Sequence, residues 1–164
     1  MSIFPTRILL ATDGSEEAEL AALRAVDLAE KTDSELHVVH VGVVPRFLES
    51  YPGTLGYERR IYKQIEEESW QRLRELSWRV KVAGGTVAGS HLRMGAVDLE
   101  IVSLAKELGA DLIVMGCRGH RGIRRAIEGS ISDRVIRHAP CPVLVVRSHE
   151  RAEAFKRSAL LQGG

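Results

Sequence analysis

The segment from Met115 to Ser130, MGCRGHRGIRRAIEGS, combines residue types that could hold a polyphosphate. Three of its four glycines, Gly116, Gly119 and Gly129, would let backbone N–H groups approach an anion without side-chain bulk. Five basic side chains share the segment with a single acid, Glu128, and they are Arg118, His120, Arg121, Arg124 and Arg125. The composition therefore predicts a phosphate-binding loop in which the 118–125 stretch folds over the phosphates.

The end of this segment has the features of a helix start. Ser130 is suited to be an N-cap residue, and Asp133 follows three residues later. Helix N-termini attract anions, and the two residues between Ser130 and Asp133 are uncharged. We therefore expect the phosphates at the Gly129–Ser130 helix start, with the hydroxyls of Ser130 and Ser132 as further donors.

A second turn of interest, Asp13-Gly14-Ser15, follows the first apolar run of the chain. The helix after it begins with three acids that would repel a phosphate, namely Glu16, Glu17 and Glu19. Asp13 is therefore expected to accept hydrogen bonds from a ribose or from a base edge. The alternative interpretation of both segments is that the glycines only form turns and the arginines only solvate a loop.

Other reactive residue types form no recognised catalytic or metal-binding pattern. The sequence has no P-loop, no GxGxxG after the first strand, and no HExxH, GxSxG or CxxC motif. His37 and His40 fit packed or hydrogen-bonded positions better than metal ligands. Cys117 is either a thiol activated by nearby arginines or a small residue in a tight turn. We therefore expect neither catalytic residues nor a metal site built by the protein.

The elements that position these residues follow from the hydrophobic pattern. Apolar runs predict strands over 7–12, 36–44, 86–94, 110–115 and 142–146. Helical periodicity predicts helices from 16 to the polar break at 31–34, from 57 to the glycines at 84–85, over 97–108, and from 130 to 139. Trp70 and Trp78 are expected to be packing residues of the long second helix.

This alternation predicts an open, mostly parallel five-stranded sheet with helices on both faces, a three-layer α/β/α sandwich. Such sheets bind ligands at the carboxyl ends of their strands, where the winding direction reverses. If the first strand is central and the fourth lies beside it, Asp13 and Gly116 face each other there.

Length, charge and cysteine content limit the class of protein. A chain of 164 residues fits one domain, predicted at 1–147 and followed by a polar tail at 148–164. A net charge of +1 argues against general nucleic-acid binding. Two cysteines far apart in sequence suggest free thiols in a reducing compartment, so cytoplasmic localisation is expected. No apolar stretch approaches the roughly 20 residues of a membrane span, and the first residues do not resemble a secretion signal.

The glycine-rich segment resembles the nucleotide-binding pattern of the universal stress protein family. The spacing Gly116-x2-Gly119-x9-Gly129-Ser130 fits that pattern, and RILLATDGSE, VMGCRG and GSISDRVIRHAPCPVLVV are similar to the family across residues 6 to 147. The resemblance implies a Rossmann-like fold of the adenine nucleotide alpha hydrolase type with strand order 3-2-1-4-5. It also implies that the protein binds ATP, often together with a divalent ion such as Mg or Mn, and that it forms a homodimer.

By matching positions, the resemblance places two groups of residues around the nucleotide. Those expected near adenine and ribose are Ala11, Thr12, Asp13 and Val41. Those expected to hold ribose and phosphates are Met115, Gly116, Gly119, Gly129, Ser130, Ile131 and Ser132. The family commonly has serine where this chain has Cys117, and the tail after Arg147 departs from the family pattern.

Three functions are compatible with these features. The first is a cytoplasmic ATP-binding regulatory protein in a stress response, whose nucleotide state is sensed by a partner or by its own dimer. The second is a weak ATPase or a nucleotidyl-transferring enzyme, although no general base is evident. The third is a nucleotide-free dimeric interaction protein.

The apolar strand Pro142 to Val146 would lie at a sheet edge, so we expect it to form the homodimer contact.

Overall fold

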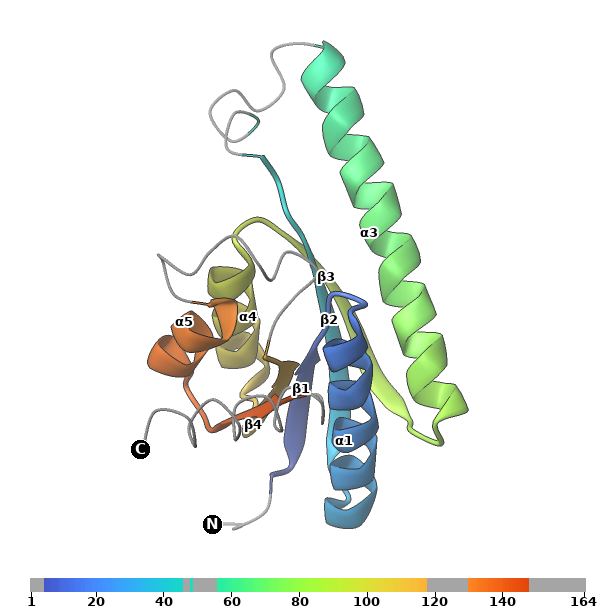
Figure 1. The fold of residues 1–164 in the computed structure, drawn as a ribbon, viewed down its shortest axis with the longest axis vertical. Helices are drawn as coiled ribbons and strands as arrows, with labels where there is room; N and C mark the ends of the chain where they lie inside the picture. Colours follow the sequence, from blue (N-terminus) through green and yellow to red (C-terminus); the bar gives the residue numbers. More distant parts are fainter. Residues whose placement is uncertain (1–4, 46–47, 49–55, 118–129, 148–164) are drawn as a thin grey trace, which may run out of the picture.

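The computed structural model describes residues 5–45, 48, 56–117 and 130–147. In these ranges one parallel sheet has the strand order β3-β2-β1-β4-β5, with helices on both sides (Figure 1). The strands are β1 (Arg7–Ala11), β2 (Glu35–Gly42), β3 (Val87–Met94), β4 (Leu112–Gly116) and β5 (Val143–Val146). The helices are α1 (Glu16–Thr32), α3 (Gly56–Val82), α4 (Val97–Leu108) and α5 (Ile131–His138). The predicted fold class and strand order are confirmed.

Strand β1 shows why its sequence is continuously apolar. Successive side chains of a strand point to opposite faces of the sheet. Ile8 and Leu10 pack against α1 and α3, whereas Leu9 and Ala11 pack on the side of α4 and α5. Each of the four is at most 5% exposed. Both faces of the sheet are therefore covered, as expected of a buried parallel strand.

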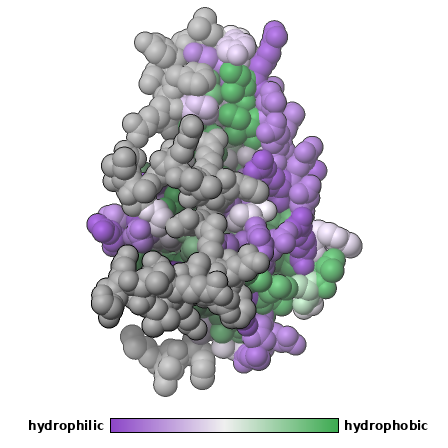
Figure 2. All heavy atoms as spheres, in the orientation of Figure 1, coloured by the Kyte–Doolittle hydropathy of each residue, from purple (hydrophilic) through white to green (hydrophobic). Residues whose placement is uncertain are grey.

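Helix α3 buries only part of its length. Its buried residues lie in the C-terminal half and are Ser69, Leu73, Leu76 and Val80. The prediction that the two tryptophans pack was wrong, because Trp70 is 41% and Trp78 66% exposed. Trp78 follows Leu76 by two residues, which places it about 200° around the helix from the buried stripe. Figure 2 shows that the outer side of α3 is largely hydrophilic.

Glycines account for local features of β3 and α4. Gly89 lies within β3, where a Cβ would come within 2.7 Å of the His37 Nδ1 atom and 2.9 Å of the His91 Nε2 atom. Gly109 ends α4 with φ at 60°, the left-handed conformation typical of a helix C-cap. The strand predicted over 86–94 is present as β3, although Gly89 and several polar residues lie within it. Among the described residues, no helix is both long and apolar enough to cross a membrane.

Candidate functional site

Strands β1 and β4 end side by side at the centre of the sheet. They pair in parallel, with Ala11 opposite Met115. The chain passes from β1 into α1 on one face of the sheet, and α5, the next described helix after β4, packs on the other face. This is the arrangement in which open α/β sheets form a ligand crevice. The two turns that the sequence singled out therefore begin at neighbouring strand ends.

The turn after β1 is held by local hydrogen bonds. The Gly14 N–H donates to Thr12 Oγ1 at 3.3 Å, and the Ser15 N–H donates to Asp13 Oδ1 at 2.9 Å. Gly14 has φ at 79°, which glycine adopts without strain. Ser15 then caps α1, its hydroxyl accepting from the Ala18 N–H at 3.2 Å. Asp13 is thus fixed in a short turn at the end of β1.

His40 supports this turn from β2. Its side chain is buried, and its Nδ1 lies 3.0 Å from the Thr12 carbonyl oxygen. Burial lowers the pKa of His40, and the nearby Arg72 lowers it further. A neutral imidazole with its proton on Nδ1 donates to that carbonyl. The expectation that His40 is packed or hydrogen-bonded is confirmed.

The start of α5 has the capping box that its sequence predicts. The Asp133 N–H donates to Ser130 Oγ at 3.2 Å, and the Ser130 N–H donates to Asp133 Oδ2 at 3.2 Å. Hydrogen bonds from the Ser130 backbone N–H and side chain hold the pKa of Asp133 below its usual value. The other first-turn N–H groups, those of Ile131 and Ser132, have no acceptor within the helix. They are the donors that an anion at this helix start would meet.

Ser132 connects α5 to the end of β4. Its side chain is 6% exposed, and its hydroxyl donates to the Cys117 carbonyl oxygen at 3.2 Å. The Ser132 Oγ also lies 2.8 Å from Ser130 Oγ. These contacts fix the helix start against the residue that follows β4.

Gly116 lies against the first turn of α1. A Cβ at this position would be 3.0 Å from the Glu17 carbonyl carbon and 3.1 Å from the Ala18 nitrogen. The neighbouring Cys117 thiol donates to the Glu17 carboxylate at 3.2 Å, and Glu17 is 5% exposed. This contact places Cys117 against α1, whereas the arginines that would activate its thiol lie outside the described residues. A side chain at position 116 would therefore press against the backbone of the first turn of α1.

The remaining predicted residues divide into two groups. Ala11, Val41 and Met115 are buried in the cluster between the sheet and α4, where they support the strand ends. Arg118, Gly119 and Gly129 lie outside the described residues, together with the other arginines of the segment. Their roles in binding phosphate stay predictions. The 148–164 tail also lies outside the described residues.

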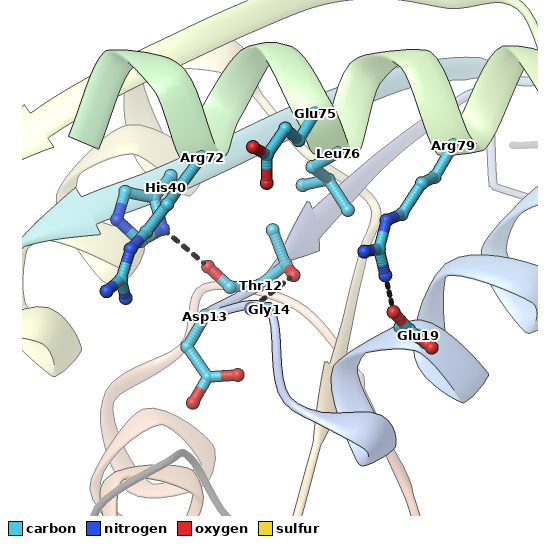
Figure 3. Close-up of a pocket in the computed structure, with 9 residues that line it drawn as sticks. All are labelled: Thr12, Asp13, Gly14, Glu19, His40, Arg72, Glu75, Leu76 and Arg79. Carbon is cyan, nitrogen blue, oxygen red and sulfur yellow. Dashed lines mark hydrogen bonds and ion pairs between the residues drawn. The ribbon is translucent and has the colours of Figure 1, made fainter. Parts of the chain in front are cut away.

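A pocket between α3 and the Thr12–Gly14 turn includes residues that the sequence analysis missed (Figure 3). Five side chains come from α1 and α3, and they are Glu19, Arg72, Glu75, Leu76 and Arg79. Arg79 forms an ion pair with Glu19 across the two helices. Helical periodicity could identify the Leu76 face of α3, but nothing local indicates that this face meets the end of β1.

Among the described residues, no group of three potential ligands could hold a metal ion.

Comparison with known proteins is consistent with this architecture. The model of the universal stress protein family matches residues 5–147. A candidate universal stress protein of Staphylococcus haemolyticus is 39% identical over 150 residues, which are 91% of this chain and 88% of that protein.

Two solved structures are similar in fold. The hypothetical protein MJ0577, whose biochemical function was assigned from its structure, matches with a TM-score of 0.72 and 26% identity, over 87% of this chain and 96% of that one. A universal stress protein in complex with cAMP matches with a TM-score of 0.68 and 24% identity, over 87% and 97% of the two chains.

Proposed function

Because this chain belongs to the universal stress protein family, we propose that it is a cytoplasmic ATP-binding regulatory protein of a stress response. The nucleotide lies between the carboxyl ends of β1 and β4. One observation carries the proposal: the Asp13 turn and the Ser130-capped helix both adjoin these two neighbouring strand ends. The Asp13 turn provides a carboxylate that can bind ribose or base, and the Ser130-capped helix provides an N-terminus that can bind phosphate.

The described residues fit an adenine nucleotide better in one orientation than in the other. Glu17, buried beside the end of β4, would repel phosphate at the start of α1. The start of α5 has the Ile131 and Ser132 N–H groups instead, and the predicted basic segment precedes it. The phosphates therefore lie toward α5 and the nucleoside toward Asp13. That a protein of the same fold binds cAMP supports an adenine nucleotide as the ligand.

A divalent ion such as Mg or Mn would be bound together with ATP rather than by the protein alone. Mg is usually held by phosphate oxygens and one or two carboxylates. The described residues contain no cluster of three potential metal ligands. The phosphates would therefore supply most of the ligands, and Mg would raise ATP affinity without binding tightly by itself.

Isothermal titration with ATP tests the site. Gly119→Val and Gly129→Val should each abolish binding while circular dichroism shows retained folding, because both would place a side chain where backbone must approach phosphate. Gly56→Ala is the control, since a Cβ there meets nothing within 4 Å. Unchanged affinity in both valine variants would exclude the assigned site. Mass spectrometry of gently purified protein should also detect bound adenine nucleotide.

We propose that the protein acts by binding and not by turnover. The Ser130 and Ser132 hydroxyls already take part in the helix cap and in the contact with Cys117, so neither is arranged as a nucleophile. Phosphate release should stay at background with ATP and Mg. Release that exceeds background and is lost in Ser132→Ala would contradict this proposal.

The protein is proposed to form a homodimer through Pro142–Val146. In the described part of the chain, β5 pairs only with β4, and Leu144 on this edge is 37% exposed. An apolar edge strand is stabilised by pairing with a symmetric copy. Light scattering at micromolar concentration should show a dimer, and a monomer alone would exclude it.

A further inference from the structure

The pocket between α3 and the Thr12–Gly14 turn has a wall that the predicted site does not include. Its cavity of about 150 Å³ is lined on one side by Thr12 and Asp13, which are also expected to contact the nucleotide. On the other side, α3 presents Arg72, Glu75 and Leu76 from successive turns (Figure 3). The pocket therefore adjoins the end of β1, on the side of the sheet opposite α5.

Two side chains of this wall are available to a ligand. Arg79 is occupied by its ion pair with Glu19. In contrast, neither Arg72 nor Glu75 forms a hydrogen bond or an ion pair among the described residues. Both are exposed to solvent, so neither contributes to the core of the fold. Their placement in the pocket is thus not explained by the packing of α3.

The charges of the lining indicate which part of a nucleotide would fit. His40 is neutral at pH 7, since burial lowers its pKa, and the Arg79–Glu19 pair cancels. On the α3 side, Arg72 and Glu75 then bring one charge of each sign, so this wall has no excess positive charge to attract a phosphate. Such a wall suits a group that has both donors and acceptors, as ribose hydroxyls and a base do.

We propose that Arg72 and Glu75 of α3 contact the nucleoside end of the nucleotide, as the second wall of the crevice opposite the Thr12–Asp13 turn. This inference rests on the proposed function. Glu75 accepts from a ribose hydroxyl or from an exocyclic amine. Arg72 donates to a ring nitrogen or lies against the face of the base, which its planar guanidinium permits.

Binding of ATP and adenosine to four variants tests the proposal. Arg72→Gln and Glu75→Gln remove the two charges, and Arg74→Gln and Glu67→Gln remove matched charges from exposed positions of α3 outside the pocket. Titration with ATP and competition by adenosine should show that each pocket variant weakens both ligands by the same factor. About tenfold is expected for one lost charge-assisted hydrogen bond. The control variants should bind as the wild type does.

Three results would overturn the inference, and each would have a different meaning for the α3 contact and for the proposed function. A loss for ATP with unchanged adenosine binding would mean that the α3 wall contacts phosphate. Unchanged binding of both ligands, with ATP binding still lost in Gly129→Val, would reject the α3 contact but leave the proposed function intact. No binding of either ligand to the wild-type protein would reject both. Because all four side chains are exposed, thermal unfolding should be the same in every variant, and this is checked first.

Discussion

Gly116→Ala tests whether the end of β4 packs directly against α1. The added Cβ would lie 3.0 Å from the Glu17 carbonyl carbon and 3.1 Å from the Ala18 nitrogen. Both are backbone atoms, so no side-chain rotation relieves the contact. Overpacking of this kind costs about 1–3 kcal/mol. The lower entropy of the unfolded alanine chain offsets only about 0.4–1 kcal/mol of that cost.

Urea denaturation measures the expected loss. The free energy of unfolding of Gly116→Ala should fall by about 1.3 kcal/mol, the difference between the mid-values of these two effects. Gly56→Ala is the matched control, because a Cβ at the first residue of α3 meets nothing within 4 Å. The control should leave stability unchanged or raise it by up to about 1 kcal/mol. Comparing the two variants separates the contact from the entropy of the unfolded chain.

The same substitution should weaken nucleotide binding. Relief of the contact requires the first turn of α1 to move away from β4, and that turn continues into Ser15 and Asp13 through their mutual hydrogen bond. Titration of Gly116→Ala with ATP should therefore show reduced affinity, with Gly56→Ala unchanged. If Gly116→Ala were as stable as Gly56→Ala, the packing argument would be refuted, and any loss of affinity would point to direct ligand contact at 116.

Three further predictions concern the elements around the site. Ser130→Ala should lower the free energy of unfolding by about 1 kcal/mol through loss of the α5 cap, measured by urea denaturation. Leu73→Ala should cost about 2–5 kcal/mol because Leu73 is 1% exposed, whereas Leu23→Ala at a 54% exposed position should cost less than about 0.5 kcal/mol. Since the pKa of His40 is lowered from 6.5, its stabilising contribution is present above pH 6.5 and decreases as pH falls through the lowered value. The stability of His40→Gln should therefore fall less steeply on acidification, and equal slopes would exclude this contribution.

The elements that could be predicted from sequence are those determined by local pattern. The run Ile8–Ala11 is apolar at every position, which only a strand covered on both faces requires. Ser130 and Asp133 have the types and spacing of a capping box, and the structure contains both of its hydrogen bonds. The helix predicted over 97–108 ends as predicted, at Gly109, where the backbone has a positive φ that glycine adopts easily. In each case the physical cause lies within a few residues of its signal.

The misassigned tryptophans show that residue type is weaker evidence than helical position. Leu73, Leu76 and Val80 define the buried stripe of α3. Trp78 falls on the opposite side, and its large apolar ring did not change that. Placing it on the same helical projection as the leucines would have predicted its exposure. By contrast, no local pattern indicates that Arg72 and Glu75 reach the Thr12 turn, because the path of α3 across the sheet is a tertiary feature.

Gly116 takes part in a tertiary contact that the spacing of the glycine motif does not reveal. Its absent side chain makes room for the backbone of α1, a contact between segments about 100 residues apart that no motif spacing reveals. The two halves of the crevice are then mechanically linked, because the end of β4 touches the helix that holds the Asp13 turn. A change at 116 should therefore alter the nucleoside half of the site as well as the phosphate half, so adenosine binding should weaken together with ATP binding in Gly116→Ala.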